Sequence, residues 1–161
     1  MRGEDPRIIG RPERFEDWQA LLDLILRSFA YMDGVIDPPS SANRLTPQAL
    51  EARARQETLL LAYQGEQLAG CLFLADRGDH VYLGKLAIEP ALQGLGLGRR
   101  FVEAAERLAR SAGKKALELE TRIELHGNHA VFARLGFTEV ARTAHPGFER
   151  PTSITMRKVL A

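Results

Sequence analysis

The stretch HVYLGKLAIEPALQGLGLGRRFVEAAERLARSAGKKALELET, residues 80–121, decides the fold. His80–Ile88 predicts an apolar strand. Apolar residues at steps of three and four then predict a helix from about Leu95, which Gly113 ends. Lys115–Thr121 alternates apolar and charged residues, as a strand with one buried face does. If the helix is a right-handed crossover, the two strands lie parallel and the stretch is a βαβ unit.

The chain before this unit predicts two helices. Phe15–Phe29 carries apolar residues at helical spacing, and acidic residues near its start suit the helix dipole. A second helix is expected to follow Thr46, which precedes a proline, and to end near Gln56. The segment between them, Tyr31–Asn43, contains two adjacent prolines and is expected to be a loop.

Strands make up most of the remaining chain. Thr58–Tyr63 and Gln67–Leu74 predict an antiparallel meander with His80–Ile88. After the βαβ unit, the chain predicts a helix and two strands over Glu124–Leu135, Phe137–Thr143 and Ser153–Val159. The expected order of elements is β-α-α-β-β-β-α-β-α-β-β, which is an α/β chain; its first strand precedes Phe15–Phe29 and is assigned no residues.

Length and composition narrow the function classes. The 161 residues suffice for one core, so a single domain over 1–161 is expected. The 22 Lys and Arg against 21 Asp and Glu are scattered, so no nucleic-acid partner is expected. Apolar runs are strand-sized and the first residues lack an apolar signal core, which favours a cytoplasmic protein without a membrane partner. Cys71 is the single cysteine and is expected in the core.

Three glycines alternate at the entrance of the central helix, at Gly94, Gly96 and Gly98. Glycines let backbone amides approach an anion, and the free amides of a helix N-terminus attract phosphate. A Walker loop would need Gly-Lys followed by Ser or Thr, which is absent. A dinucleotide fingerprint would need glycine where Arg99 or Phe101 stands. The loop therefore predicts a phosphate site of another kind.

The loop Gln93-Gly-Leu-Gly-Leu-Gly98 resembles the [Arg/Gln]-x-x-Gly-x-[Gly/Ala] loop of the Gcn5-related N-acetyltransferase (GNAT) superfamily. Leu86–Pro90 and Phe101–Glu106 resemble the strand and helix that flank it, and Phe132–Phe137 resembles the family's Tyr-x-x-Leu-Gly-Phe segment. The resemblance covers nearly the whole chain. It implies a mixed, mainly antiparallel, twisted sheet of six to seven strands, flanked by about four helices, with a βαβ unit at its centre.

The resemblance implies acetyl-CoA as co-substrate. The pyrophosphate would lie on loop amides, which here belong to Gln93, Gly94, Leu95, Gly96, Leu97, Gly98 and Arg99. The pantetheine arm would run beside the preceding strand and contact backbone groups of Leu86, Ala87 and Ile88, one of which polarises the acetyl carbonyl. Phe132 would lie against CoA on the following helix. Asn128 on that helix is either a further CoA contact or a cap residue.

An amine acceptor, with a pKa of about 10.4, is protonated near neutral pH and needs a base. The polar candidates on the two parallel strands are His80, Tyr82, Glu118 and Glu120. Glu120 ranks first because it is near the carboxyl end of its strand, where ligands of α/β folds bind. For each of them taken singly, the alternative is a solvated or packing residue, which is the usual role of such side chains on strands. Phe132 replaces a tyrosine that protonates the CoA thiolate in many relatives, so water or Tyr82 would have to take over that role.

The expected function is transfer of the acetyl group to an amine, of a small molecule or a protein, by direct attack on the thioester. The alternative is a non-catalytic acyl-CoA sensor or interaction module, which Phe132 keeps open. Acceptor specificity is expected from the loops Phe29–Asn43 and Arg142–Arg150. His126 and His129 lack further ligands, so no metal site is expected. Whether the chain forms a homodimer is left open.

Overall fold

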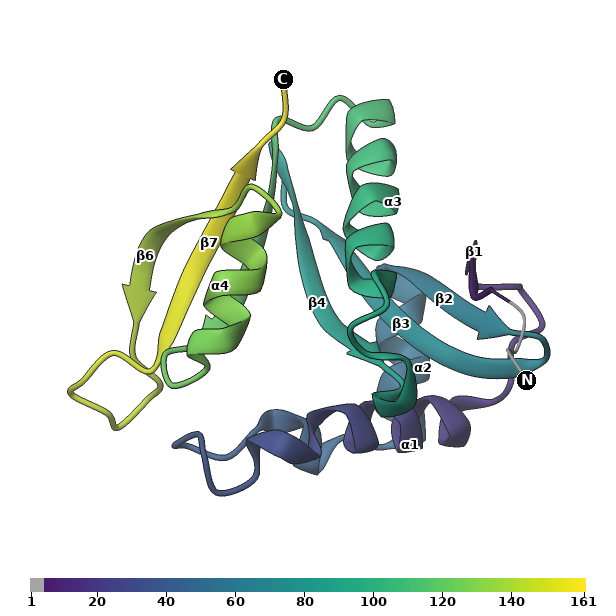
Figure 1. The fold of residues 1–161 in the computed structure, drawn as a ribbon, viewed down its shortest axis with the longest axis horizontal. Coiled ribbons are helices and arrows are strands. Elements are labelled where there is room, and N and C mark those ends of the chain that lie inside the picture. The colour runs from purple at the N-terminus through teal and green to yellow at the C-terminus, as the bar shows by residue number, and fades with distance from the viewer. Residues whose placement is uncertain (1–4) are drawn as a thin grey trace.

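The computed structural model describes residues 5–161 as an open seven-stranded sheet with helices on both faces (Figure 1). The strands are β1 (Arg7–Gly10), β2 (Thr58–Gln64), β3 (Gln67–Asp76), β4 (His80–Ile88), β5 (Ala116–Arg122), β6 (Thr138–Thr143) and β7 (Ser153–Val159). The helices are α1 (Trp18–Phe29), α2 (Pro47–Gln56), α3 (Leu97–Ser111) and α4 (His126–Arg134).

The sheet has the order β1-β2-β3-β4-β5-β7-β6. Of the strand pairs within residues 5–161, only β4 and β5 run parallel, with α3 as the crossover between them. This confirms the mixed, mainly antiparallel sheet, the four flanking helices and the central βαβ unit.

The two faces of the sheet have separate cores. On one face, α1 and α2 pack against β2 and β3, with fully buried Leu24, Ile25 and Phe73 at the contact. On the other face, α3 buries Phe101 against β4 and β5, and Phe132 of α4 packs against the same core (Figure 1).

Within the described residues, no helix is both long enough and apolar enough to cross a membrane.

Local chemistry determines where the helices begin. Thr46 caps α2 as expected, because its Oγ1 accepts a hydrogen bond from the Ala49 amide at 3.1 Å. The apolar face of the first helix includes Phe15, but α1 begins at Trp18; the two rings meet edge to face at 4.9 Å. Gly96 has a φ of 86°, so α3 begins after it, two residues beyond the expected Leu95.

The segment Tyr31–Asn43, expected to be a loop, takes part in two short 3₁₀ turns, at Ala30–Met32 and Ser41–Arg44. The loop prediction is therefore too simple. The two prolines lie between these turns, where no helical amide is needed, so they stop α1 without preventing short local turns on either side.

A β-bulge in β4 separates this strand from β5. Cys71 pairs with Ala87 and Phe73 with Gly84, so β4 carries one more residue than β3 between these pairs. Lys85, at the bulge, has a φ of 52°, and no other non-glycine residue of the described chain has a positive φ. Pairing of β4 with β5 stops at Leu83 and Leu119. Beyond this point the two strands diverge.

Close packing of α3 on the sheet gives a stability test at Gly70. A Cβ there would lie 2.9 Å from Phe101 Cε2 and 3.0 Å from the Ala87 carbonyl oxygen. We expect Gly70→Ala to lower the free energy of unfolding by about 1–3 kcal/mol through overpacking, measured by urea denaturation.

The matched control is Gly10→Ala in β1, where nothing lies within 4 Å of an added Cβ. We expect it to change the free energy of unfolding by less than about 0.5 kcal/mol. A Gly70→Ala protein as stable as the wild type would contradict the contact between α3 and the β3–β4 pair.

Candidate active site

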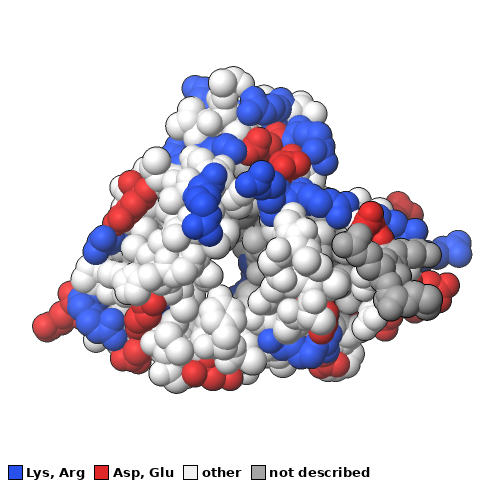
Figure 2. All heavy atoms as spheres, in the orientation of Figure 1, with Lys and Arg blue, Asp and Glu red and all other residues white. Residues whose placement is uncertain are grey.

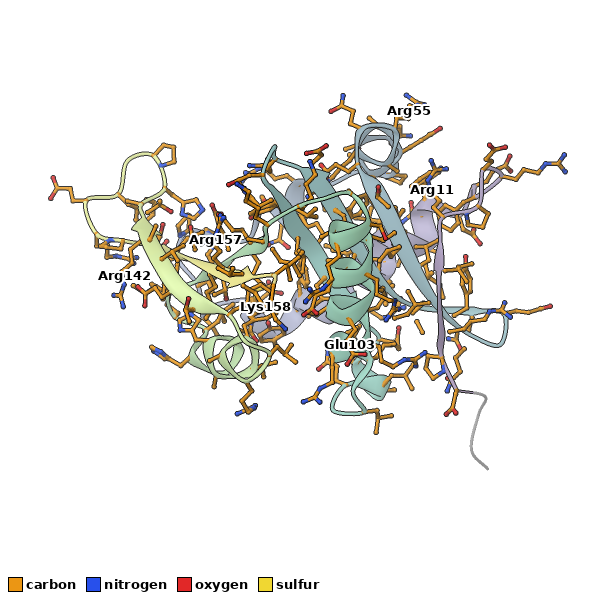
Figure 3. All side chains as sticks on the ribbon, turned by 90° about the horizontal axis from the view of Figure 1, so that it is seen from above. Arg11, Arg55, Glu103, Arg142, Arg157 and Lys158 are labelled. Atoms are coloured by element: carbon orange, nitrogen blue, oxygen red, sulfur yellow. The ribbon has the colours of Figure 1, made fainter. Side chains whose placement is uncertain are left out.

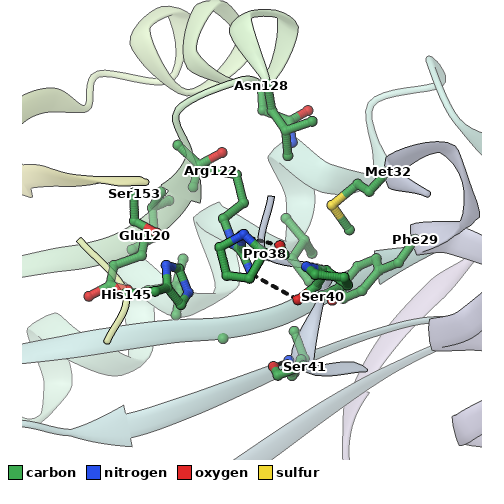
Figure 4. A pocket seen from close by; sticks show the side chains of 18 of the residues that line it. Phe29, Met32, Pro38, Ser40, Ser41, Glu120, Arg122, Asn128, His145 and Ser153 are labelled. Atoms are coloured by element: carbon green, nitrogen blue, oxygen red, sulfur yellow. Dashed lines mark hydrogen bonds between the residues drawn. The ribbon is translucent and has the colours of Figure 1, made fainter. Parts of the chain in front are cut away.

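A cleft of about 420 Å³ lies where β4 and β5 diverge (Figure 4). Both strands line it, together with the segment between α1 and α2, one side of α4, and the loop between β6 and β7. Its volume falls within the range of about 300–1,000 Å³ that is usual for small-molecule sites. Of the site residues predicted from sequence, the cleft is lined by Tyr82, Leu86, Glu120, Asn128 and Phe132.

The glycine loop forms the N-terminal end of α3. Gly94 and Gly96 have φ values of 81° and 86°, and a Cβ added at Gly94, Gly96 or Gly98 would meet nothing within 4 Å. No backbone acceptor of residues 5–161 takes a hydrogen bond from the amides of residues 94–99. The Gln93 side chain donates to the Ile88 carbonyl at 3.3 Å and so ties the loop to the end of β4. The loop thus offers a row of free amides at the positive end of a helix dipole.

The other predicted loop residues differ in what they can offer. Leu97 is only 3% exposed and its side chain belongs to the core, so only its backbone is available to a ligand. Leu95 is 74% exposed. Arg99 lines a small hollow together with Arg134 and Lys158. Figure 2 shows Lys and Arg side chains gathered on the same face of the molecule as α3.

One amide of β4 stands out at the bulge. The Glu89 amide donates to the Ala69 carbonyl on β3 at 2.8 Å, and alternation in the ladder points the Ala87 amide the same way. The Ile88 amide points away from β3, but it donates to Ser28 Oγ of α1 at 3.2 Å. Of the three residues predicted to present backbone groups, Leu86 is the one that lines the cleft, and it has no pairing partner in the register of β4 with β3 or with β5.

Three titratable side chains meet in the cleft. Burial, followed by repulsion from Glu120, raises the pKa of Tyr82 to about 12, so this phenol stays protonated at neutral pH. Burial, followed by the charge of Arg122, lowers the pKa of His145 from its ordinary value of 6.5. Glu120 is exposed on β5, and Figure 4 shows it beside His145. His145 was expected from sequence only as part of a specificity loop.

His80 does not line the cleft. Its Nδ1 lies 2.8 Å from Asp79 Oδ1 and its Nε2 lies 3.6 Å from Glu118 Oε2, near the start of β4. Glu118 in turn pairs with Arg157 of β7. His80 and Glu118 therefore belong to an ion-pair network that holds the strands together at the other end of the β4–β5 pair.

On α4, Phe132 and Asn128 face the cleft one helical turn apart. Asn128 Nδ2 donates to the Tyr31 hydroxyl oxygen at 3.0 Å. This hydrogen bond gives the Asn128 side chain a role other than the two expected from sequence, a helix cap or a CoA contact. The bond brings a phenol from the segment after α1 next to the helix that carries Phe132. From sequence, Tyr31 was expected only as part of a specificity loop; its contact with Asn128 was missed, because the two residues lie 97 positions apart.

Sequence reasoning also missed four cationic residues that line the cleft, namely Arg44, Arg53, Lys85 and Arg122. Burial, followed by the charges of Arg53 and Arg122, lowers the pKa of Lys85. Arg122 donates to the carbonyls of Pro38 at 2.6 Å and Pro39 at 3.2 Å, which holds the loop at the cleft edge (Figure 4). A charged residue inside an otherwise apolar strand, such as Lys85, was the only signal available in sequence.

Other candidates have structural roles. Burial raises the pKa of the Cys71 thiol to about 12, which makes it a core residue without nucleophilic character. His129 Nε2 lies 2.9 Å from the Arg122 carbonyl. Within residues 5–161, no three His, Cys, Asp or Glu side chains are placed to hold a metal ion.

Solved structures share this fold along almost the whole chain. The ribosomal-protein-S18-alanine N-acetyltransferase from Escherichia coli is 22% identical with a TM-score of 0.73, over 96% of this chain and 94% of that one. A GNAT family acetyltransferase from Elizabethkingia anophelis with acetyl-CoA bound is 16% identical with a TM-score of 0.69, over 96% and 98%. An acetyltransferase from Bacillus subtilis in complex with CoA is 19% identical with a TM-score of 0.68, over 98% and 100%.

At these identities the solved structures establish the fold alone. No curated protein matches the chain significantly. The model of the acetyltransferase (GNAT) family, however, matches residues 18–137, which run from the start of α1 to the residue before β6 and include the glycine loop and most of the cleft. The chain therefore belongs to the GNAT family of acetyltransferases.

Proposed function

We propose that residues 1–161 act as one domain that transfers the acetyl group of acetyl-CoA to an amine by direct attack on the thioester. The observation that carries the proposal is that β4 links the cleft at its bulge to the free amides at the start of α3, where the Gln93 side chain donates to the Ile88 carbonyl. The solved relatives that hold CoA or acetyl-CoA on this fold support it. A cytoplasmic location is part of the proposal, supported by the single, unpaired cysteine.

In this proposal the amides of residues 94–99 bind the pyrophosphate, and the divergence of β4 from β5 accommodates the pantetheine arm. Acetyl-CoA supplies an activated acetyl thioester. The Leu86 amide donates to the acetyl oxygen as negative charge builds on it, a contribution of about 3 kcal/mol or more in comparable sites. Of the predicted groups it is preferred, because Ser28 already accepts from the Ile88 amide.

The acceptor ammonium must lose a proton before it attacks. We assign this step to His145, which is neutral at pH 7 because its pKa lies below 6.5. Its Nδ1 contacts Thr152 Oγ1, and Nε2 has no hydrogen-bond partner within residues 5–161. Glu120, the first-ranked base from sequence, attracts the ammonium and keeps it beside His145. His80 is not assigned a part, because it lies outside the cleft lining.

The departing thiolate, with an ordinary pKa near 8.5, leaves more readily when it is protonated. Phe132 cannot donate a proton. We assign this role to Tyr31, whose oxygen accepts a hydrogen bond from Asn128 and whose own proton remains available. As the amide forms, the nitrogen loses its second proton to solvent. Solvent then reprotonates Tyr31. Tyr82, protonated up to high pH, is a donor rather than a base.

The second candidate function is a non-catalytic acyl-CoA sensor, which the missing hydroxyl at Phe132 favours. The two functions differ in one measurement, the release of free CoA thiol in the presence of a panel of amines. A protein that binds acetyl-CoA by calorimetry but releases no thiol above the hydrolysis background would be the sensor.

Gly98→Glu tests the loop by opposite effects on stability and binding. Gly98 is the second residue of α3, with open space around its Cα, so a glutamate there improves helix propensity and the dipole interaction. We expect the free energy of unfolding to rise by about 1 kcal/mol while CoA affinity in calorimetry falls at least tenfold through repulsion of the pyrophosphate.

Gly98→Gln is the matched control, with nearly the same size and no charge. We expect it to bind CoA more tightly than Gly98→Glu does, and the difference between the two variants should shrink in high salt. Unchanged CoA affinity in both variants would place the pyrophosphate elsewhere.

His145→Gln tests the assignment of the base. With a folded pKa below 6.5, wild-type His145 is deprotonated above that range and becomes protonated as pH falls through it, so kcat/KM should fall toward acid pH. We expect His145→Gln to lower kcat/KM by about 10²–10⁴-fold and to remove this acid limb. Glu120→Gln should mainly raise KM for the amine. An intact acid limb in His145→Gln would assign the base to another group.

Tyr31→Phe tests the proton donor, and a second substitution makes the test specific. We expect Tyr31→Phe to lower kcat at least tenfold, because the departing sulfur loses its proton source. Adding Phe132→Tyr, which places a phenol one helical turn from Asn128 on α4, should restore kcat to within about threefold of the wild type. A Tyr31→Phe protein with wild-type kcat would remove Tyr31 from the mechanism.

A further inference from the structure

The charges in the cleft are unbalanced in favour of cations. Four cationic side chains line it, and Glu120 is the only carboxylate among its lining residues within the described chain. An amine acceptor is itself positive before it loses its proton, so a cleft built for a bare amine would be expected to carry an excess of carboxylates. The cations therefore point to a second, negatively charged group on the acceptor.

Arg53 reaches into the cleft from α2. Its Nε pairs with Glu57 at 3.0 Å, and its guanidinium lies over the Phe73 ring with Cζ 4.8 Å from the ring centroid. Its Nη2 would lie 2.4 Å from a Cβ at Gly84, so the glycine at this position of β4 is what admits the guanidinium. The two Nη atoms have no acceptor within residues 5–161 and remain available for a ligand.

Lys85 lies one residue further along β4, at the bulge. Its ammonium donates to Ser41 Oγ at 3.2 Å and forms no ion pair with any described carboxylate. Burial, followed by the charges of Arg53 and Arg122, lowers the pKa of this ammonium. Two like charges close to each other with one counter-charge between them, Glu57 on Arg53, are costly, and a bound anion would relieve that cost.

Arg122 has a different part. Its guanidinium donates hydrogen bonds to the carbonyls of Pro38 and Pro39, and these bonds fix the loop that carries Ser41. Among the cleft cations on α2, β4 and β5, this leaves Arg53 and Lys85 with unused donors. In the view of Figure 4, Ser41 lies on a different side of Arg122 from Glu120 and His145, so an anion near Ser41 would leave the base side of the cleft to the amine.

We propose that the acceptor is a small amine that also carries a carboxylate or a phosphate, and that Arg53 and Lys85, with Ser41, bind this anionic group. The proposal rests on the proposed function of the cleft. A guanidinium beside an ammonium suits both anions, because the first offers two parallel donors and the second a compact charge. The site thereby selects a small zwitterionic acceptor over a peptide N-terminus, whose neighbouring group is a neutral amide.

Matched pairs of amines test the proposal in the full-length protein. We expect glycine and β-alanine to give at least tenfold higher kcat/KM than glycinamide and β-alaninamide, with thiol release as the readout. O-phosphoethanolamine is compared with ethanolamine to test a phosphate in the same way. The anionic amines with the higher kcat/KM show whether the site prefers a carboxylate or a phosphate. Equal kcat/KM for the charged and neutral members of every pair would overturn the proposal.

Variants locate the site. Lys85→Gln, and Arg53→Gln combined with Glu57→Gln so that no carboxylate is left unpaired, should each raise KM at least tenfold for the anionic amine. Both should leave the neutral amine within about threefold. Arg55→Gln removes the same charge from the same helix, but Arg55 points away from the sheet and pairs with Glu51 (Figure 3). We expect Arg55→Gln to leave KM unchanged for both the anionic and the neutral amine. A Lys85→Gln protein in which KM rises equally for the two amines would contradict the assignment.

A binding measurement keeps this test separate from catalysis. In protein saturated with CoA, calorimetry should show tighter binding of N-acetylglycine than of N-acetylglycinamide, and Lys85→Gln should abolish the difference. If no amine is turned over but this difference is found, the anion site stands and the proposed transferase function falls. If thiol is released but N-acetylglycine and N-acetylglycinamide bind alike, the transferase stands and the anion site falls.

Discussion

The cleft depends on one break in backbone pairing, the bulge in β4. One extra residue in β4, with Lys85 in the left-handed region, ends the parallel ladder after Leu83 and Leu119. An unbroken β4 would pair with β5 to its end and close the sheet, leaving neither a cleft nor an unpaired Leu86 amide. A positive φ at a non-glycine residue is strained. The surrounding structure holds Lys85 in this conformation, because β4 is paired with β3 on both sides of the bulge.

We assign anion binding to two sets of groups of different chemistry, one at the start of α3 and one in the cleft. At the start of α3 the binding groups are neutral amides, made accessible by glycines at positive φ. In the cleft they are full charges on Arg53 and Lys85, partly shielded from solvent. Amides at a helix N-terminus bind a diphosphate whatever is attached to it, whereas charged side chains on α2 and β4 can vary without disturbing the loop. The division allows one fold to keep its co-substrate while it changes its acceptor.

Sequence predicted the parts of the fold that local chemistry determines. The glycine loop, the Thr46 cap, the βαβ unit and most strand bounds follow from turn residues, spacing and alternation, all of which act over a few residues. The bulge was not predicted, because His80–Ile88 reads as a regular strand and the extra residue is visible only against β3.

The cleft combines residues that no local pattern connects. Tyr31, Arg53 and His145 come from three separate segments and meet only because α1, α2 and the β6–β7 loop surround the end of β4. Strand position placed Glu120 in the cleft, but it could not exclude His80, since both residues lie on the same face of the parallel pair.

The central claim is that the amides at the start of α3 and at Leu86 bind one extended co-substrate. A two-dimensional ¹H–¹⁵N NMR titration of the labelled protein with CoA observes these amides directly. The largest shifts are expected at residues 94–99 and at Leu86, with Gly113, the glycine at the far end of α3, unchanged. If CoA binds and shifts other amides while these stay in place, the co-substrate does not occupy this opening, and the cleft serves another ligand.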